Sequence, residues 1–138
     1  MPRKFPRSPY ECLLGYVHLP RLIDKARLHR QGMLVDYNYK TSGFDKNLLQ
    51  FLQLDPDAFE EIVNQTNDDA TVADWVQKNA RVHSPEQIEA WNKEVIQREP
   101  ISAEQSARFK FTLKVLGAEN RSEIKTYFDL IELDEGRL

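Results

Sequence analysis

The sequence predicts an all-α protein, folded as a single compact domain of about six to seven short helices in a bundle-like arrangement, with one extended loop near residues 33–43. Three observations lead to this prediction. Apolar residues recur at helical spacing along most of the chain. Helix-start signals, in which Ser or Asp precedes a proline or an acidic residue, separate these segments. The connections are short, and no two alternating segments are placed to pair as a sheet.

The chain has 138 residues, which is the size of one domain with a core of its own. We expect residues 1–6 to form a loose N-terminal arm and residues 7–138 to form the helical domain. No segment repeats, and none is low in complexity.

The first third of the chain is predicted to hold two helices and the extended loop. Ser8-Pro9-Tyr10-Glu11 has the order of a capping box and predicts a short helix that Gly15 ends. Pro20 begins a second helix, and Gly32 stands where a helix C-terminus favours glycine. In residues 33–43 the apolar residues alternate as in a strand, but no partner strand is available, so we expect an extended loop with aromatic anchors.

The remaining two thirds are predicted to be helices that begin at recognisable caps. Asp45 begins a helix that runs to Leu54, and Asp55-Pro56 begins the next. The later helices begin at Asp68 or Asp69, at the capping box Ser84-Pro85-Glu86-Gln87, at Ser102 and near Ser122.

The net charge and its distribution along the chain limit the kinds of molecule that the protein is expected to bind. The net charge is −3 and the isoelectric point is near 5.6, which disfavours broad nucleic-acid binding. Residues 1–40 hold eight basic and three acidic residues, so their net charge is +5 and that of the remainder is −8. This asymmetry indicates either an anion-binding face or a basic segment that docks on the acidic part of the same domain.

The cysteine count and the hydropathy pattern predict the cellular compartment of the protein. The single cysteine, Cys12, excludes an internal disulfide, and its neighbours Leu13 and Leu14 suggest a buried thiol. The alternative is a reactive nucleophile, for which His18 is the only nearby base in the sequence. No apolar run of signal-peptide length follows the basic first residues, and no window is apolar enough to span a membrane. We therefore expect a cytoplasmic protein without membrane association. We expect no cofactor, because the sequence lacks a phosphate loop and a dinucleotide fingerprint, and no metal site, because His29 and His83 lack ligand-spaced partners.

The densest group of ionisable side chains lies at residues 15–28. On the helix that begins at Pro20, Arg21, Asp24 and Lys25 point roughly opposite to its apolar residues. These groups either pair on a solvated face or bind a phosphate or carboxylate. Tyr37 and Tyr39 either close such a pocket or pack. Glu135 or its neighbour Asp134 either pairs with Arg21 or Lys25 or belongs to a frayed tail. The candidate ligand-binding residues are Tyr16, His18, Arg21, Asp24, Lys25, Tyr37, Tyr39 and Glu135.

His18 is the best candidate for a general acid or base, because an unperturbed histidine titrates near pH 6.5. Asp24, Asp36 or Glu135 would orient it, and His18 with Asp24 would form the catalytic pair. The alternative is a histidine packed in the core with its ring nitrogen satisfied. Three functions remain open: a non-catalytic binding domain for a small anionic metabolite or a protein partner, a small enzyme acting on a phosphorylated or carboxylated substrate, and a homo-oligomeric scaffold.

Four blocks of the sequence carry a family resemblance. They are Gly-Tyr-Val-His-Leu-Pro-Arg-Leu-Ile-Asp-Lys-Ala-Arg at 15–27, Phe-Leu-x-Leu-Asp at 51–55, Asp-Trp-Val at 74–76 and Leu-Asp-Glu-Gly-Arg at 133–137. Together they make the chain, from about Arg7 to its end, similar to an uncharacterised family of short bacterial proteins, a domain of unknown function. The resemblance implies a bacterial origin and a helical domain. It implies no activity and assigns no catalytic residue.

Overall fold

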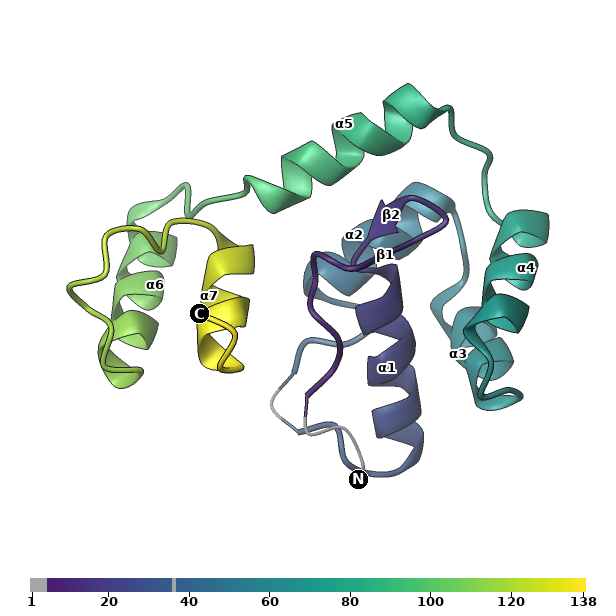
Figure 1. The fold of residues 1–138 in the computed structure, drawn as a ribbon, viewed down its shortest axis with the longest axis horizontal. Helices are drawn as coiled ribbons and strands as arrows, with labels where there is room; N and C mark the ends of the chain where they lie inside the picture. Colours follow the sequence, from purple (N-terminus) through teal and green to yellow (C-terminus); the bar gives the residue numbers. More distant parts are fainter. Residues whose placement is uncertain (1–4, 36) are drawn as a thin grey trace. The chain divides into compact units, whose positions relative to one another are not determined.

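A computed structural model describes residues 5–35 and 37–138 of the chain. This part contains seven helices and one two-stranded hairpin (Figure 1). The chain divides into two compact units, Met1–Ala90 and Trp91–Leu138, which we call unit 1 and unit 2. The all-α prediction is confirmed, and so is the number of helices. Residues 1–4 of the predicted N-terminal arm and Asp36 lie outside the described residues.

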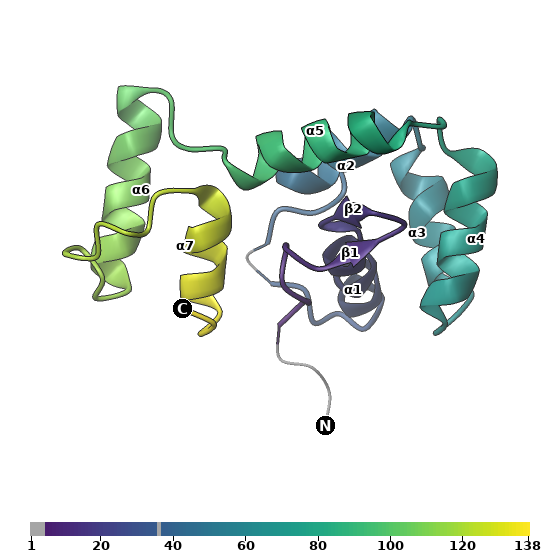
Figure 2. The same ribbon diagram turned by 45° about the horizontal axis from the view of Figure 1, so that its top comes forward.

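Unit 1 begins with the hairpin and continues through four helices. The elements in chain order are β1 (Cys12–Leu13), β2 (Tyr16–Val17), α1 (Leu19–Arg30), α2 (Gly43–Leu52), α3 (Pro56–Asn64) and α4 (Asp69–Asn79). Helix α1 packs against α3, and α3 lies beside α4 (Figure 2). The residues between α1 and α2 form no helix or strand, which agrees with the predicted extended loop at the positions described.

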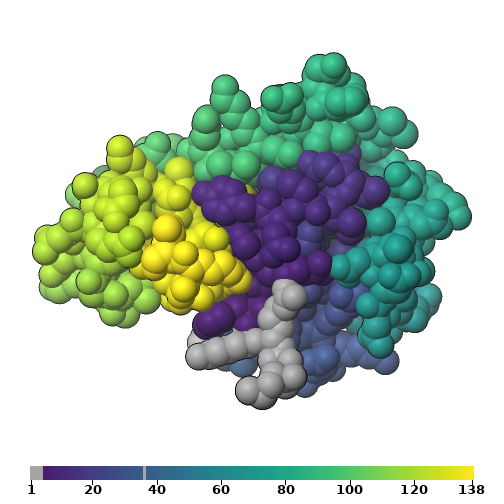
Figure 3. Space-filling model, viewed as in Figure 1, coloured from purple at the N-terminus to yellow at the C-terminus, as the bar shows by residue number. Residues whose placement is uncertain are grey.

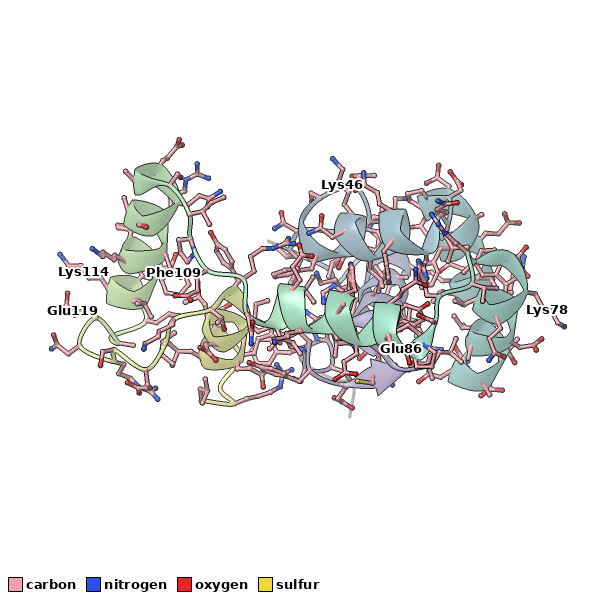
Figure 4. The ribbon with its side chains drawn as sticks, turned by 90° about the horizontal axis from the view of Figure 1, so that it is seen from above. Lys46, Lys78, Glu86, Phe109, Lys114 and Glu119 are labelled. Atoms are coloured by element: carbon pink, nitrogen blue, oxygen red, sulfur yellow. The ribbon has the colours of Figure 1, made fainter. Side chains whose placement is uncertain are left out.

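The boundary between the units falls inside α5 (Pro85–Ile96), and unit 2 continues with α6 (Ala103–Val115) and α7 (Tyr127–Asp134). In unit 2, Phe109 points from α6 toward α7 (Figure 4), and its ring meets that of Tyr127 edge-on with centroids 5.7 Å apart. Phe109, Leu113, Ala118 and Ile124 form a buried apolar cluster in this unit, and Tyr127, Leu130 and Leu133 pack against it.

Most of the predicted helix caps are present. Asp55 Oδ2 accepts a hydrogen bond from the amide of Ala58 at 2.9 Å. The Ser84 hydroxyl accepts from the amide of Gln87, and the Gln87 side chain accepts from the amide of Ser84 in return. Ser102 accepts from the amide of Gln105 in the same way. Each cap satisfies a backbone donor that has no partner inside its helix, which is why these sequence signals locate the helix starts.

The predicted helix at residues 8–15 is wrong, because this segment forms a turn and the hairpin. The amide of Glu11 donates to the carbonyl of Ser8 at 3.1 Å, and the Ser8 hydroxyl accepts from the amide of Tyr10, two residues on. Leu14 and Gly15 then adopt positive φ values of 57° and 84°, as in a tight hairpin turn. Between Pro9 and Gly15 there is room for little more than one helical turn, too few residues to offset the cost of helix nucleation.

Two further expectations are corrected. Cys12 is exposed rather than buried, and it lies on the hairpin strand β1. The N-terminal segment, purple in Figure 3, forms part of the visible surface of the molecule. The last helix begins at Tyr127 and not near Ser122. Thr126 caps it by accepting from the amide of Asp129 at 3.0 Å, while the residues before it form a turn in which the amide of Ile124 donates to the carbonyl of Arg121.

Candidate functional site

His18 occupies the junction between the hairpin and α1. Its amide donates to the carbonyls of Pro9 and Glu11, at 2.9 and 3.2 Å, and its φ is 73°. A positive φ is uncommon for any residue other than glycine and is retained only where surrounding contacts impose it. As the N-cap residue of α1, His18 makes no side-chain cap. Its imidazole instead points into unit 1, where only 1% of the residue is exposed.

The imidazole of His18 is bonded to a buried carboxylate. His18 Nε2 lies 2.5 Å from Oδ1 of Asp45, which is in the first turn of α2 and is fully buried. The next residue, Lys46, points outward (Figure 4), so Asp45 is the inward-facing member of the pair. The ring of Phe44 lies beside the imidazole, with centroids 5.9 Å apart.

Asp45 accepts two more hydrogen bonds. Lys25 Nζ donates to its Oδ1 at 3.1 Å, and the amide of Lys40 donates to its Oδ2 at 3.1 Å. Lys25 also donates to the carbonyl of Asn38 at 2.9 Å. These bonds tie the loop that precedes α2 to the buried side of α1, so the loop covers the carboxylate. A buried charge is tolerated when it is paired and hydrogen-bonded in this way.

The protonation states follow from this geometry. Burial acts to raise the pKa of Asp45, but the hydrogen bonds from His18 and Lys25 outweigh it and hold the pKa below its usual range. Burial lowers the pKa of His18, and the hydrogen bond to Asp45 opposes only part of this effect. Asp45 is therefore ionised and His18 neutral near pH 7. Since a carboxylate only accepts, the ring proton of His18 is on Nε2, and Nδ1 carries a lone pair.

Two further candidate residues lie next to this group. Arg21, which is buried, donates from Nη1 to the carbonyl of Arg7 at 3.2 Å. Its guanidinium carbon lies 5.8 Å from the centre of the Tyr37 ring, and Lys25 Nζ lies 5.9 Å from the same point. Both distances fit cation–π attraction. We call the five residues the His18 cluster: His18, Arg21, Lys25, Tyr37 and Asp45.

Asp24 lies outside the His18 cluster and belongs to a separate ion-pair network. Its two carboxylate oxygens accept from Nε and Nη2 of Arg7, each at 3.0 Å. Arg7 Nη1 donates to Asp69 at 2.7 Å, and Arg27 donates to the same carboxylate at 2.8 Å. This network ties the segment before the hairpin to α1 and α4. The carboxylate bonded to His18 is thus Asp45 and not the predicted Asp24. Of the other predicted partners, Asp36 lies outside the described residues and Glu135 belongs to unit 2.

The other three candidates have different partners. The Tyr16 hydroxyl lies 3.1 Å from Nδ1 of His83. The Tyr39 hydroxyl donates to Glu60 at 2.6 Å, and burial together with this bond raises the pKa of Tyr39. Glu135 belongs to unit 2, where it pairs with Arg137 at 2.9 Å. The structure therefore brings His18, Arg21, Lys25 and Tyr37 together, and places Tyr16 and Tyr39 in other polar contacts.

Sequence reasoning missed Asp45 as a site residue, although it was recognised as the start of a helix. One signal points to its burial. Asp45 stands three and four residues before Leu48 and Leu49, so it lies on the apolar face of its helix. A carboxylate on an apolar helix face requires a buried donor, and the nearby histidine and lysine supply two.

The chain is thus a small helical protein in which a buried histidine–lysine–aspartate group joins the start of α1 to the first turn of α2. The chain belongs to the family described as domain of unknown function DUF5069, whose model matches residues 3–137. The resemblance found in the sequence is thereby confirmed. A comparison with curated proteins gives no match.

The described residues contain neither a group placed to bind a metal ion nor a helix that could span a membrane. Within residues 5–35 and 37–138, no group of three or more His, Cys, Asp and Glu side chains is placed to hold a metal ion. Over the same ranges, no helix has the length and apolar character needed to cross a bilayer. The bacterial origin, the cytoplasmic location, the homo-oligomeric state and the single-domain organisation of residues 7–138 stay predictions.

Proposed function

We propose that this protein is a non-catalytic binding domain for a small anionic ligand carrying a carboxylate or phosphate group, and that the His18 cluster is its site. One observation carries the proposal. His18 Nδ1 is buried and has no hydrogen-bond partner among the described residues, while two cationic side chains, Arg21 and Lys25, lie beside the same Tyr37 ring. Buried polar atoms are rarely left unsatisfied, and each one that is requires an explanation, such as a bound ion or a catalytic role.

The chemistry of this nitrogen sets the kind of ligand and how it is bound. In neutral His18, Nδ1 only accepts hydrogen bonds, so it would repel the oxygen of an anion. Once protonated, Nδ1 donates to that oxygen, and the resulting imidazolium is stabilised on its other side by Asp45. An anion therefore binds together with a proton. Arg21 and Lys25 add the positive potential that draws an anion to a site of low dielectric constant.

The loop before α2 controls access to this site. Asn38 and Lys40 hold it down through their bonds to Lys25 and Asp45. The ligand reaches Nδ1 when this loop lifts, and the Tyr37 ring then closes over the bound anion. Loops that close over a binding site commonly move on the microsecond to millisecond scale.

Calorimetric titration with sulfate tests the proposal, because sulfate does not titrate near neutral pH. Titrations in Tris and in HEPES, whose ionisation enthalpies differ, give the number of protons taken up. We expect about one proton per sulfate near neutral pH, and no proton uptake in His18→Asn. Asparagine tolerates the positive φ at position 18, so this variant keeps the helix start.

A matched pair of variants tests the cationic side of the site. Arg21→Gln is expected to weaken sulfate binding about tenfold or more, because it removes a charged donor. Arg30→Gln removes the same charge from the exposed end of α1 and is expected to leave binding unchanged. Equal affinities for the two variants, or sulfate binding without proton uptake, would overturn the proposal.

A second function is favoured by the geometry of the histidine and aspartate. An aspartate that fixes the tautomer of a histidine leaves the opposite ring nitrogen as a base, which is the division of roles in hydrolytic triads. Applied here, His18 Nδ1 would remove a proton from a nucleophile that attacks a phosphorylated or carboxylated substrate. Turnover of p-nitrophenyl phosphate or p-nitrophenyl acetate by the protein, lost in His18→Asn and retained in His29→Asn, would support the enzyme. Turnover that survives in His18→Asn would exclude this role.

A further inference from the structure

A cavity of about 190 Å³ lies within unit 1, apart from the His18 cluster. The hairpin turn, the end of α2, the end of α4, the segment after α4 and the first turn of α5 surround it. Most of its wall is aliphatic, formed by Leu14, Leu52, Val76, Ala80, Val82 and Ile88. An apolar cavity of about 150 Å³ is large enough to bind benzene, so this one accommodates a six-carbon ring or a branched aliphatic group.

The polar residues of the cavity wall are Tyr16, Gln77, Arg81 and His83, and two of them form a tyrosine–histidine pair. The Tyr16 hydroxyl lies 3.1 Å from His83 Nδ1, and the His83 ring stacks on that of Phe51 with centroids 3.8 Å apart. Burial raises the pKa of Tyr16, so its hydroxyl keeps its proton, and we assign this hydroxyl as the donor to Nδ1 of His83. Burial also lowers the pKa of His83, and the positive charge of Arg81 adds to this effect. His83 is therefore neutral at pH 7, accepts at Nδ1 and carries its proton on Nε2.

Arg81 adds a positive charge near the ring of His83. Its side chain lines the cavity and lies at the exposed surface. Its amide donates to the carbonyl of Leu52 at 2.9 Å, which fixes the segment after α4 against the end of α2. The backbone at Arg81 and the ring of His83 are thus held in place by hydrogen bonds before any ligand binds, which lowers the cost of binding.

We propose that this cavity is a binding site for a small monocarboxylate with a cyclic or branched body of about six carbons. The body occupies the space between the aliphatic side chains. The carboxylate accepts a hydrogen bond from His83 Nε2 and pairs with the guanidinium of Arg81. A neutral molecule of the same shape would gain only the hydrophobic contacts, and a carboxylate without the body would gain only an exposed ion pair, which contributes little. Binding here depends on neither His18 nor Arg21, so the two proposed sites stand or fall separately.

An NMR titration of the whole chain with cyclohexanecarboxylate tests this site. We expect amide shifts concentrated at the cavity wall, in particular at Leu14, Ala80 and Ile88. Cyclohexylmethanol supplies the body without the charge, and acetate supplies the charge without the body. Both are expected to bind at least about tenfold more weakly, since a hydrogen bond to a charged group commonly accounts for that factor.

Two exposed positions provide a matched pair of variants. Arg81→Gln is expected to reduce affinity for cyclohexanecarboxylate by up to about fivefold, the most that an exposed ion pair commonly contributes, and to leave that for cyclohexylmethanol unchanged. Lys78→Gln removes a charge from the same helix end, but Lys78 points away from the body of the unit (Figure 4) and pairs with Asp74. It is expected to bind as the unaltered protein does. Ala80→Phe, which fills the cavity, should abolish binding.

Three results would overturn the proposal: no shifts at the cavity wall, cyclohexylmethanol binding as tightly as the carboxylate, or equal affinities in Arg81→Gln and Lys78→Gln. The variant Arg21→Gln tests whether this cavity and the His18 cluster bind their ligands independently. Loss of sulfate binding in that variant with retained cyclohexanecarboxylate binding would show two independent sites.

Discussion

His18 Nε2 and Asp45 Oδ1 are 2.5 Å apart, and this contact joins the residue before α1 to the first turn of α2 across 27 positions of sequence. Both side chains are buried, and the same carboxylate also holds Lys25 and the amide of Lys40. Asp45 is therefore the point at which the hairpin, the first two helices and the loop between them are connected.

Replacing Asp45 by asparagine should destabilise the protein strongly. The change keeps the shape of the side chain but leaves the buried ammonium group of Lys25 without its carboxylate. Removing one member of a buried ion pair commonly costs about 3–5 kcal/mol. Urea denaturation followed by circular dichroism would measure this loss. Asp57→Asn is the matched control, because the Asp57 side chain is 83% exposed in its pair with Lys40. A similar loss in both variants would show that Asp45 has no special structural role.

The buried histidine predicts a loss of stability on mild acidification. In the unfolded chain His18 titrates near pH 6.5, while burial keeps its pKa in the folded protein lower. Below about pH 6.5 the unfolded state therefore binds more protons, and the free energy of unfolding falls as the pH falls. Above that pH the full contribution is present. The lowered pKa of Asp45 acts in the same direction in a separate window, below about pH 4.

Denaturation curves between about pH 5 and pH 8 test this dependence. His18→Asn should flatten the curve of unfolding free energy against pH, since it removes the titrating group. His83→Gln should flatten it less, because the pKa of His83 is also lowered but its ring lies in a partly exposed contact with Tyr16 and Phe51. A slope unchanged in His18→Asn would mean that the imidazole is not neutral in the folded protein.

Much of the fold could be predicted from the sequence because its signals are local. The caps at Asp55, Ser84 and Ser102 each act within three residues, so the residue types alone locate the helix starts. The same signal failed at Ser8, where a proline and a glutamate also follow at the expected positions. There the glycine at position 15 leaves too short a segment, and hydrogen bonds to the backbone of His18 favour the hairpin.

The candidate site could be predicted only in part, for the opposite reason. Arg21 and Lys25 lie on one helix face, so helical periodicity brings them together with His18 at the helix start. Asp45 reaches His18 only through the tertiary packing of α1 and α2, which no local pattern encodes. Asp24 has the spacing of a local partner for Arg21 and Arg27, yet it pairs with Arg7, since that arginine can bind both of its oxygens.

The hairpin turn predicts a graded response to substitution at Gly15. This residue has a φ of 84°, and a Cβ placed there would meet its nearest side-chain atom, Ile88 Cγ2, at 3.7 Å. That is an ordinary contact, so the cost arises from the backbone and not from a clash. Gly15→Val should destabilise the protein by roughly 1–2 kcal/mol, and Gly15→Asn by less, because asparagine adopts the left-handed region more readily. Thermal unfolding of the two variants gives the comparison, and equal losses would contradict the backbone explanation.

The Arg7 network predicts measurable coupling between the chain start and α4. Arg7 binds Asp24 with two side-chain nitrogens and Asp69 with the third, and its side chain is only 18% exposed. A double-mutant cycle of Arg7→Met and Asp69→Asn isolates one of these contacts. Exposed pairs such as Lys78 with Asp74 typically couple by about 0.3–0.5 kcal/mol. The Arg7 pair is better shielded from solvent, so we expect a coupling energy of about 1 kcal/mol that persists in high salt. The coupling of Lys78 and Asp74 should vanish under the same conditions.

Arg7→Lys should not restore the coupling energy, since an ammonium group cannot reproduce the forked contact with Asp24 while reaching Asp69. A coupling that salt removes as readily as the exposed pair would mean that Arg7 contributes only a surface charge.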